Sequence, residues 1–209
     1  MPRFSSPPLS SEDRRDLLFR ARRAITEAVC RQNIADLAAP SGRLAEPGSA
    51  FVTVHCAGRL RGCVGRLDRT LALAEVVAQC AIGAVTEDKR FRPLQADEIP
   101  EIEIEISVLS ELQPATPQEL EMGTHGIVVS RAERRGLLLP QVAAERGWSV
   151  ERFLEETCKK AGLEPNAWRD PPTTLLAFTA EVFGESESPG RQGRANSPGI
   201  AEENKRGSA

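Results

Sequence analysis

The chain has 209 residues, enough for one domain or for two small lobes that share a core, and too few for a large multidomain enzyme. Its 27 basic and 30 acidic side chains give a formal net charge of -3, which excludes binding to nucleic acid through bulk charge alone. Only five Cys and two His are present, so the residues able to act as a nucleophile or a soft metal ligand are few.

The first half of the chain shows helical spacing of apolar residues, then short alternating runs, then helical spacing again. Ala57-Gly58 separates the two short runs and predicts the turn of a β-hairpin. In chain order we expect a helix from Ser10 or Ser11 to about Asn33, a loop over 38–50, strands Phe51–Cys56 and Arg59–Val64, and a helix from Leu71 to about Thr86.

The second half begins with EIEIEISV, whose strict alternation of apolar and acidic residues predicts a strand with one buried face. Thr116, Pro117 and Glu119 form a capping box and predict a short helical turn. The elements expected after it are a hairpin from Gly126 to Pro140, a helix from Ser149 to about Ala161 and a strand over Thr173–Phe183.

Strands and helices are therefore mixed along the chain, and the clearest strand has one polar face. This pattern predicts an α+β protein with antiparallel or mixed sheets. We expect a flexible N-terminus over 1–9, one domain over 10–184, and a disordered polar tail over 185–209.

The cysteines indicate a reducing compartment. Their number is odd, and no two of them form a CxxC pair. The N-terminal segment lacks the continuous apolar stretch of a secretory signal, and the most apolar window, Leu71–Val85, is too short to cross a bilayer. We expect a soluble cytoplasmic protein.

The hexapeptide LRGCVG, residues 60–65, places a cysteine between two glycines at the end of a strand, with Arg61 in the same segment. Cys63 could be a nucleophile, because neighbouring guanidinium groups lower the pKa of a thiol. The arginines and backbone amides could instead bind a phosphate or carboxylate with no chemistry at the sulfur. A third possibility is a bulged hairpin in which the cysteine is a small buried hydrophobe.

The register of the hairpin bears on a histidine partner for Cys63. With a two-residue turn and no bulge, Val52 opposes Cys63 and His55 points to the other face, so His125 becomes the better candidate base. A one-residue bulge would reverse this parity. His125 stands at the start of a strand, where a structural role is the alternative.

Three other groups of residues indicate a functional site less clearly. The spacings of His55, Cys56, Cys63 and His125 match no compact zinc pattern, so we predict no metal site, and no cofactor is indicated. Three alternating glutamates, at 101, 103 and 105, are typical of a solvated strand face. The basic runs at 87–94 and 131–135 lack the interleaved aromatic residues of a single-strand nucleic-acid platform.

LRGCVG followed in order by RFRPL, EIEIEISVLS, HGIVV, RRGLLLPQVAAERGW, FLEETCKKAGL and FTAEVF resembles the AMMECR domain family over about Leu17 to Phe183. The resemblance implies an α+β protein of two small intertwined α/β subdomains, with mixed or antiparallel sheets and a cleft between them near the hexapeptide; both subdomains would lie within 10–184. It implies two partners, a Memo-type protein similar to class III extradiol dioxygenases and a radical SAM protein. Family activity is not established.

Two hypotheses follow. In the first, the chain is an enzyme or enzyme component in which Cys63 is the nucleophile or redox thiol and His125 a candidate base. In the second, the same cleft belongs to a non-catalytic adaptor that binds a protein or nucleic acid. The residues expected to bind the ligand in the first hypothesis are Arg61, Gly62, Gly65 and Arg90.

Overall fold

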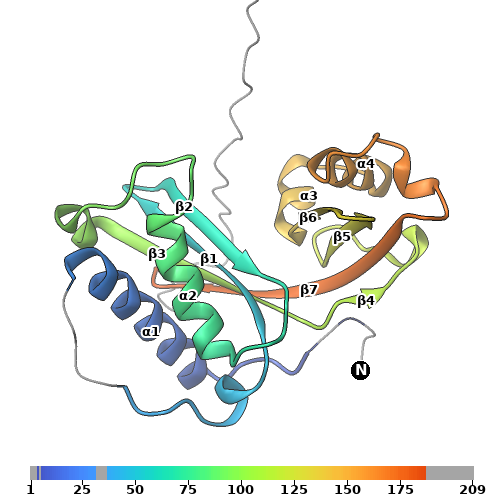
Figure 1. Cartoon of the computed structure of the whole chain (residues 1–209). Coiled ribbons are helices and arrows are strands. Elements are labelled where there is room, and N and C mark those ends of the chain that lie inside the picture. The colour runs from blue at the N-terminus through green and yellow to red at the C-terminus, as the bar shows by residue number, and fades with distance from the viewer. Residues whose placement is uncertain (1–3, 5, 32–36, 187–209) are drawn as a thin grey trace, which may run out of the picture.

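The computed structural model describes residues 4, 6–31 and 37–186 and has two lobes joined by one long strand (Figure 1). The first lobe contains α1 (Ser11–Cys30), β1 (Ser49–Cys56), β2 (Arg59–Arg66), α2 (Leu73–Thr86) and β3 (Ile102–Leu109). The second contains β4 (Gln113–Pro114), β5 (His125–Arg131), β6 (Arg134–Leu138), α3 (Pro140–Arg146) and α4 (Val150–Lys160). The joining strand is β7 (Thr174–Gly184).

All named strands pair antiparallel in the order β2-β1-β3-β7-β5-β6, and β4 pairs with β7 beside this path. The predicted α+β class with antiparallel strands is thus confirmed. β7 pairs with β5 through its first half and with β3 through its second half. One strand therefore belongs to both lobes and fixes their relative position.

The sheet curls where β3 ends against β7. Leu109 pairs with Ala180, and the next residue, Ser110, donates its backbone N–H to the carbonyl oxygen of Thr179. The N–H of Thr179 donates not to a backbone carbonyl but to the Oγ of Ser110, at 3.0 Å. A hydroxyl thus replaces a ladder carbonyl in a buried position, which satisfies the N–H while the backbone of β3 turns away.

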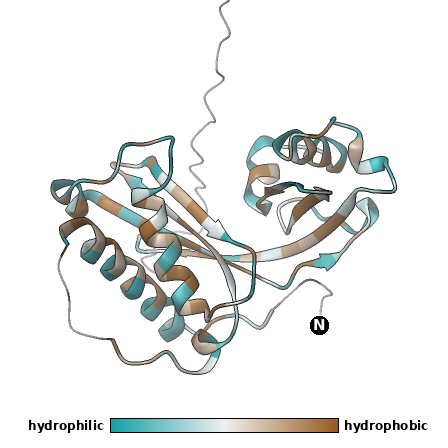
Figure 2. Ribbon diagram, viewed as in Figure 1, coloured by the Kyte–Doolittle hydropathy of each residue, from teal (hydrophilic) through white to brown (hydrophobic). Residues whose placement is uncertain are grey.

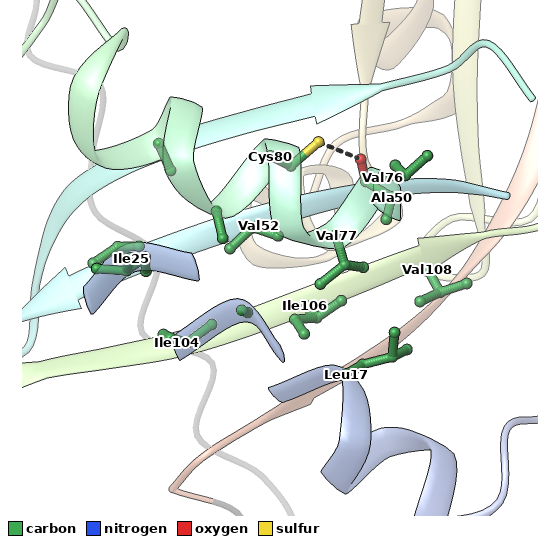
Figure 3. Close-up of a cluster of buried hydrophobic side chains, with 14 of the residues drawn as sticks. Leu17, Ile25, Ala50, Val52, Val76, Val77, Cys80, Ile104, Ile106 and Val108 are labelled. Carbon is green, nitrogen blue, oxygen red and sulfur yellow. Dashed lines mark hydrogen bonds between the residues drawn. The ribbon is translucent and has the colours of Figure 1, made fainter. Parts of the chain in front are cut away.

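The core of the first lobe lies between the sheet and its two helices. α1 carries both hydrophilic and hydrophobic residues, as an amphipathic helix does (Figure 2). Its Leu17 and Ile25 meet α2 and the strands, and the Sγ of Cys80 lies 3.7 Å from the carbonyl oxygen of Ala50 (Figure 3). The strand residues in this core alternate and are Ala50, Val52, Val54, Ile102, Ile104, Ile106 and Val108. We call the helix-covered side the outer face of the sheet.

The outer face continues through β7 into the second lobe. Phe183 packs in the first core and Ala177 in the second, which also holds Ile127, Val129 and the buried side of α4. The intervening side chains of β7 point the other way. Leu176, Phe178 and Ala180 form a third apolar cluster on what we call the inner face.

The inner face joins the two lobes. Its cluster combines Phe51 and Leu67 of the first lobe with Leu137 and Leu139 of the second, around buried Phe178. Side chains of both lobes can meet there only because the sheet curls toward this face. Polar side chains on the inner face of the first lobe, among them Thr53 on β1, Cys63 on β2 and Glu105 on β3, form the candidate site.

The sequence predictions of both hairpins, the helices and the last strand agree with the structure to within a few residues. The capping box at Thr116 forms around a short 3-10 turn, Pro117–Glu119. α3 was not predicted, and the residues that follow Arg31 in the expected first helix lie outside the described part of the chain. Among the described residues, no helix is long and apolar enough to cross a membrane.

The ends of the folded unit are packed. In the N-terminal segment, Phe4 contacts the second core and Leu9 the first, and both are buried. Glu185 accepts hydrogen bonds from Arg22 and from the N–H of Ile104, just past the end of β7. Residues 1–3, 5 and 187–209, which include most of the expected tail, lie outside the described residues.

Candidate functional site

The β1–β2 hairpin contains a bulge. Ala57 and Gly58 both have positive φ, which gives the tight two-residue turn expected from the sequence, and His55 pairs with Leu60. Val54 then pairs with Gly62, so Arg61 is an extra residue on β2.

The bulge corrects the register predicted without it. Thr53, not Val52, opposes Cys63. Since Thr53 and His55 alternate with buried Val52 and Val54, both lie on the inner face with Cys63. His55 therefore shares the face of Cys63 instead of pointing away.

Cys63 is half-buried and held from two sides. The Oγ1 hydroxyl of Thr53 donates to its Sγ at 3.4 Å. Its backbone N–H points away from β1 and donates to Oδ2 of Asp88 at 3.0 Å. In an antiparallel ladder, a pair whose N–H groups point outward brings its side chains closest together, which explains the contact between the hydroxyl and the sulfur.

Asp88 closes the turn after α2 beside Cys63. Its carboxylate accepts from the Cys63 N–H, from the Arg90 N–H and from the Arg90 guanidinium, whose Nη2 lies 2.7 Å away. These donors stabilise the ionised carboxylate, with Arg90 contributing most, and lower the pKa of Asp88 to about 2. Sequence reasoning did not select Asp88, although an Asp two residues before the N–H it accepts is a common turn signal.

Arg61 anchors the loop that follows α2. Its Nε and Nη2 donate to the two carboxylate oxygens of Glu98, at 3.0 and 3.1 Å, and its Nη1 donates to the carbonyl oxygen of Arg92 at 2.8 Å. The Arg61 side chain is only 11% exposed. Its guanidinium lowers the pKa of Glu98 to about 2. This fork holds the segment after α2 against β2.

The two glycines of the hexapeptide lie on opposite faces. A Cβ on Gly62 would lie 1.8 Å from the carbonyl oxygen of Ala84, so α2 packs directly on its Cα. A Cβ on Gly65 would fall within 2.1 Å of the ring of Phe51, which covers this position on the inner face. Gly62 and Gly65, expected to allow close approach of a ligand, instead allow close approach of a helix and an aromatic ring.

The pKa of the Cys63 thiol is raised, mainly by burial, and the Asp88 carboxylate adds to this effect. The hydrogen bond from Thr53 and the charges of Arg90 and Lys160 act in the opposite direction without overcoming it. The expectation that neighbouring arginines lower this pKa was therefore wrong in its net direction. The thiol is neutral at neutral pH.

Two residues of the second lobe interact electrostatically with residues of this site. Lys160, at the end of α4, interacts electrostatically with Cys63 and Arg90. Glu145, on α3, interacts in the same way with Glu105 on β3. Both side chains are exposed, yet burial is the largest cause of the lowered pKa of Lys160 and the raised pKa of Glu145. A side chain that projects between two lobes is reached by solvent and still has protein on several sides, which explains why burial shifts the pKa of an exposed group.

His125 lies apart from Cys63. It begins β5 and has the same parity as Ile127 and Val129, which pack in the outer-face core. Its ring meets Phe4 edge-on, with 4.9 Å between centroids, and its Nδ1 accepts the N–H of Glu121 at 3.0 Å. His125 and Cys63 therefore belong to opposite faces of the same sheet.

Possible metal-ligand groups and cavities within the described residues were compared with the position of Cys63. No group of three or more His, Cys, Asp or Glu side chains within residues 4, 6–31 and 37–186 is arranged to hold a metal ion. A cavity of about 310 Å³ opens between α1 and α2, beside Arg20 and Ala78, and a cavity of about 30 Å³ lies under the N-terminal segment beside Glu181. Neither is lined by Cys63.

These features define an α+β protein that presents a glycine-flanked cysteine on the inner face of a curled antiparallel sheet. The chain belongs to the AMMECR1 family, whose model matches residues 18–183.

Related proteins and one solved structure support this family membership. A protein of Methanothermobacter thermautotrophicus is 38% identical over 85% of this chain and 97% of its own length. Protein MK0488 of Methanopyrus kandleri is 40% identical over 87% of this chain and 93% of its own. The crystal structure of the uncharacterized protein PH0010 from Pyrococcus horikoshii has a TM-score of 0.76 and 36% identity, and the match covers 81% of this chain and 90% of that one.

Proposed function

We propose that this protein is an enzyme or enzyme component whose reacting group is the thiol of Cys63, on the inner face between the lobes. The observation that carries the proposal is the electrostatic coupling of Cys63, in the first lobe, to Lys160 in the second. A buried structural cysteine such as Cys80 or Cys158 packs within one core. Cys63 instead lies where a molecule held between the lobes would contact it.

Because its pKa is raised, the Cys63 thiol acts as a nucleophile only when another group favours its ionised form. Only the thiolate is strongly nucleophilic, and at rest Cys63 holds its proton. Thr53, Arg90 and Lys160 already favour the ionised form. A ligand that brings the ammonium of Lys160 closer to the sulfur would strengthen this attraction and let the thiol ionise when the substrate is in place. Of the two histidines, His55 shares this face, and His125 does not.

The same raised pKa favours one alternative, a non-catalytic binding module in which the neutral thiol only contributes to packing. The partners implied by family resemblance, a Memo-like protein and a radical SAM protein, belong to both versions of the proposal, as does a cytoplasmic location. The two versions differ in whether Cys63 chemistry is required.

The first prediction concerns the pH dependence of alkylation at Cys63. We expect its reaction with iodoacetamide, followed by peptide mass spectrometry, to show an apparent pKa above the value of about 8.5 of a free thiol. Lys160→Met should raise that pKa further and slow alkylation at pH 8 roughly threefold, because a cation that stabilises the thiolate is lost.

Lys159→Met is the matched control, because Lys159 pairs with Glu156 on the exposed side of α4. It should leave the alkylation profile unchanged. If Lys160→Met also leaves it unchanged, the two lobes do not act together on the thiol and the proposed site is wrong.

The second prediction concerns the partners. We expect the purified full chain to retain the Memo-like and radical SAM proteins from the same cell, and Cys63→Ser to retain them equally well, because Thr53 and Asp88 can still bind a serine at this position. Turnover of the assembled proteins should be abolished by the same substitution. Unchanged turnover would support the binding module instead.

A further inference from the structure

The N-terminal segment crosses the long strand β7 from one lobe to the other. We call Phe4 and residues 6–10 the strap. Phe4, which is 6% exposed, packs in the core of the second lobe, and Leu9, which is 5% exposed, packs in the core of the first. Both cores lie on the outer face of the sheet. The strap therefore joins the two lobes on the face opposite to Cys63.

Two polar side chains of β7 hold the strap between these anchors. The Oγ1 hydroxyl of Thr179 donates to the carbonyl oxygen of Phe4 at 2.9 Å, and the backbone N–H of Leu9 donates to Oε2 of Glu181 at 3.0 Å. The other oxygen of the Glu181 carboxylate accepts from Nε of Arg14, on α1, at 2.8 Å. The strap is thus tied to the middle of β7 and, through Glu181, to the start of α1.

The strap covers the point on β7 where one lobe gives way to the other. Pairing with β5 ends at Thr179, and pairing with β3 begins at Ala180, the next residue. The N–H of Thr179 donates to the Oγ of Ser110, so a side chain replaces a ladder carbonyl at this boundary. A change of angle between the lobes can be taken up by rotation about a few backbone bonds here, as at a hinge.

The packing under the middle of the strap is incomplete. A cavity of about 30 Å³ lies between the strap and the hinge, lined by Ser6, Ser110, Thr179 and Arg43 among others. This volume has room for a water molecule, and the buried Nε of Arg43 has no hydrogen-bond partner among the described residues. Water can replace the strap's hydrogen bonds there. The two apolar ends of the strap therefore contribute most of its attachment.

On the inner face, the lobes meet through the third apolar cluster. The members that reach across are Phe51 and Leu67 from the first lobe and Leu137 and Leu139 from the second, and all four are half-buried. Half-buried side chains lose less by separating than fully buried ones do, because they already contact solvent. The strap therefore adds a constraint that the inner-face contact does not supply.

We propose that the strap fixes the angle between the lobes and thereby controls access to Cys63 on the inner face. Because it is anchored in both lobes, rotation at the hinge changes the distance between its anchors, so one anchor must detach. When Phe4 leaves its site, the lobes rotate about Thr179 and Ala180, and the inner face opens to a larger molecule. The inference rests on the proposed function in taking Cys63 as the reacting thiol.

Hydrogen–deuterium exchange of the full chain, followed by mass spectrometry, tests the strap and the hinge. We expect Phe4→Ala to speed exchange about fivefold in peptides covering 105–112 and 176–183, where the lobes meet. Peptides from α2 and α4 should exchange at the parent rate, because each lobe keeps its fold. Phe4→Leu should stay close to the parent, since leucine retains an apolar anchor.

Thr179→Val tests the hydrogen bond that holds the strap over the hinge. It removes the hydroxyl that donates to Phe4 and keeps the branched shape of the side chain, so exchange in the same peptides should rise about twofold. Thr26→Val is the matched control, because the hydroxyl of Thr26 donates to a backbone carbonyl oxygen, that of Arg22, at 2.9 Å within α1. It should leave exchange at the hinge unchanged.

Alkylation of Cys63 by iodoacetamide at one fixed pH tests the control of access. Phe4→Ala should react about threefold faster than the parent, because more molecules expose the thiol at any moment, and Phe4→Leu should not. Equal exchange at the hinge in Phe4→Ala and the parent, or equal acceleration over the whole chain, would overturn the strap. Faster exchange with unchanged alkylation would overturn its control of Cys63. Each result is separate from the turnover of Cys63→Ser, which tests the role of the thiol itself.

Discussion

Gly62→Ala is expected to lower the free energy of unfolding by about 3 kcal/mol, at the upper end of the usual cost of overpacking. The added Cβ would lie 1.8 Å from the carbonyl oxygen of Ala84 and 2.8 Å from its carbonyl carbon. These are backbone atoms of α2, which cannot rotate away as a side chain can, so the helix must move off the sheet. Urea unfolding followed by circular dichroism measures the loss.

Gly58→Ala provides the control for Gly62→Ala. Gly58 has a positive φ, and a Cβ there would meet nothing within 4 Å, so only the strain of the turn is added, about 1 kcal/mol. If the two variants lose equal stability, α2 does not pack on Gly62 as described. The comparison also tests the reading of the hexapeptide, because a ligand-binding glycine would tolerate alanine in the absence of ligand.

The hairpin shows what sequence can and cannot predict. Its strands and its turn follow from alternation and from Ala57-Gly58, which are local features. The bulge at Arg61 is not local, because it is held by Glu98 and the carbonyl oxygen of Arg92, far along the chain. A single extra residue then changes which side chains share a face with Cys63, so the predicted register of His55 was reversed.

Local sequence patterns also could not predict which residues make up the site. Cys63 and Arg90 were selected from the sequence, but Thr53, Lys160 and Glu145 were not. Thr53 reaches Cys63 only through the bulged register, and Lys160 and Glu145 reach the inner face only because β7 belongs to both lobes. The alternation of the glutamates predicts a solvated strand face, yet Glu105 is half-buried and interacts electrostatically with Glu145 of the other lobe. Long-range topology, not residue type, decides these contacts.

Arg61→Met is expected to lower the free energy of unfolding at pH 7 by about 2 kcal/mol. Removing one partner of a buried ion pair costs more than this, but Arg92 still faces the Glu98 carboxylate, with its Nη1 3.1 Å away. Arg152→Met is the matched control, because that arginine is 50% exposed and pairs with Glu155 and Glu156 on the surface of α4. Its loss should cost less than 0.5 kcal/mol, in the usual range of surface pairs.

Acid should reduce the cost of Arg61→Met. The folded pKa of Glu98 is about 2, below its ordinary value of 4.5, so the stability contributed by this carboxylate is complete above pH 4.5 and is lost as the pH falls toward 2. Urea unfolding of the parent chain and of Arg61→Met at pH 7, 4 and 3 should therefore converge as the pH falls. The double variant Arg61→Met with Glu98→Met should regain part of the loss at pH 7, because it leaves no unpaired carboxylate against β2. If the cost of Arg61→Met is independent of pH, the arginine stabilises the loop through the Arg92 carbonyl alone, and the charge of Glu98 has no part in it.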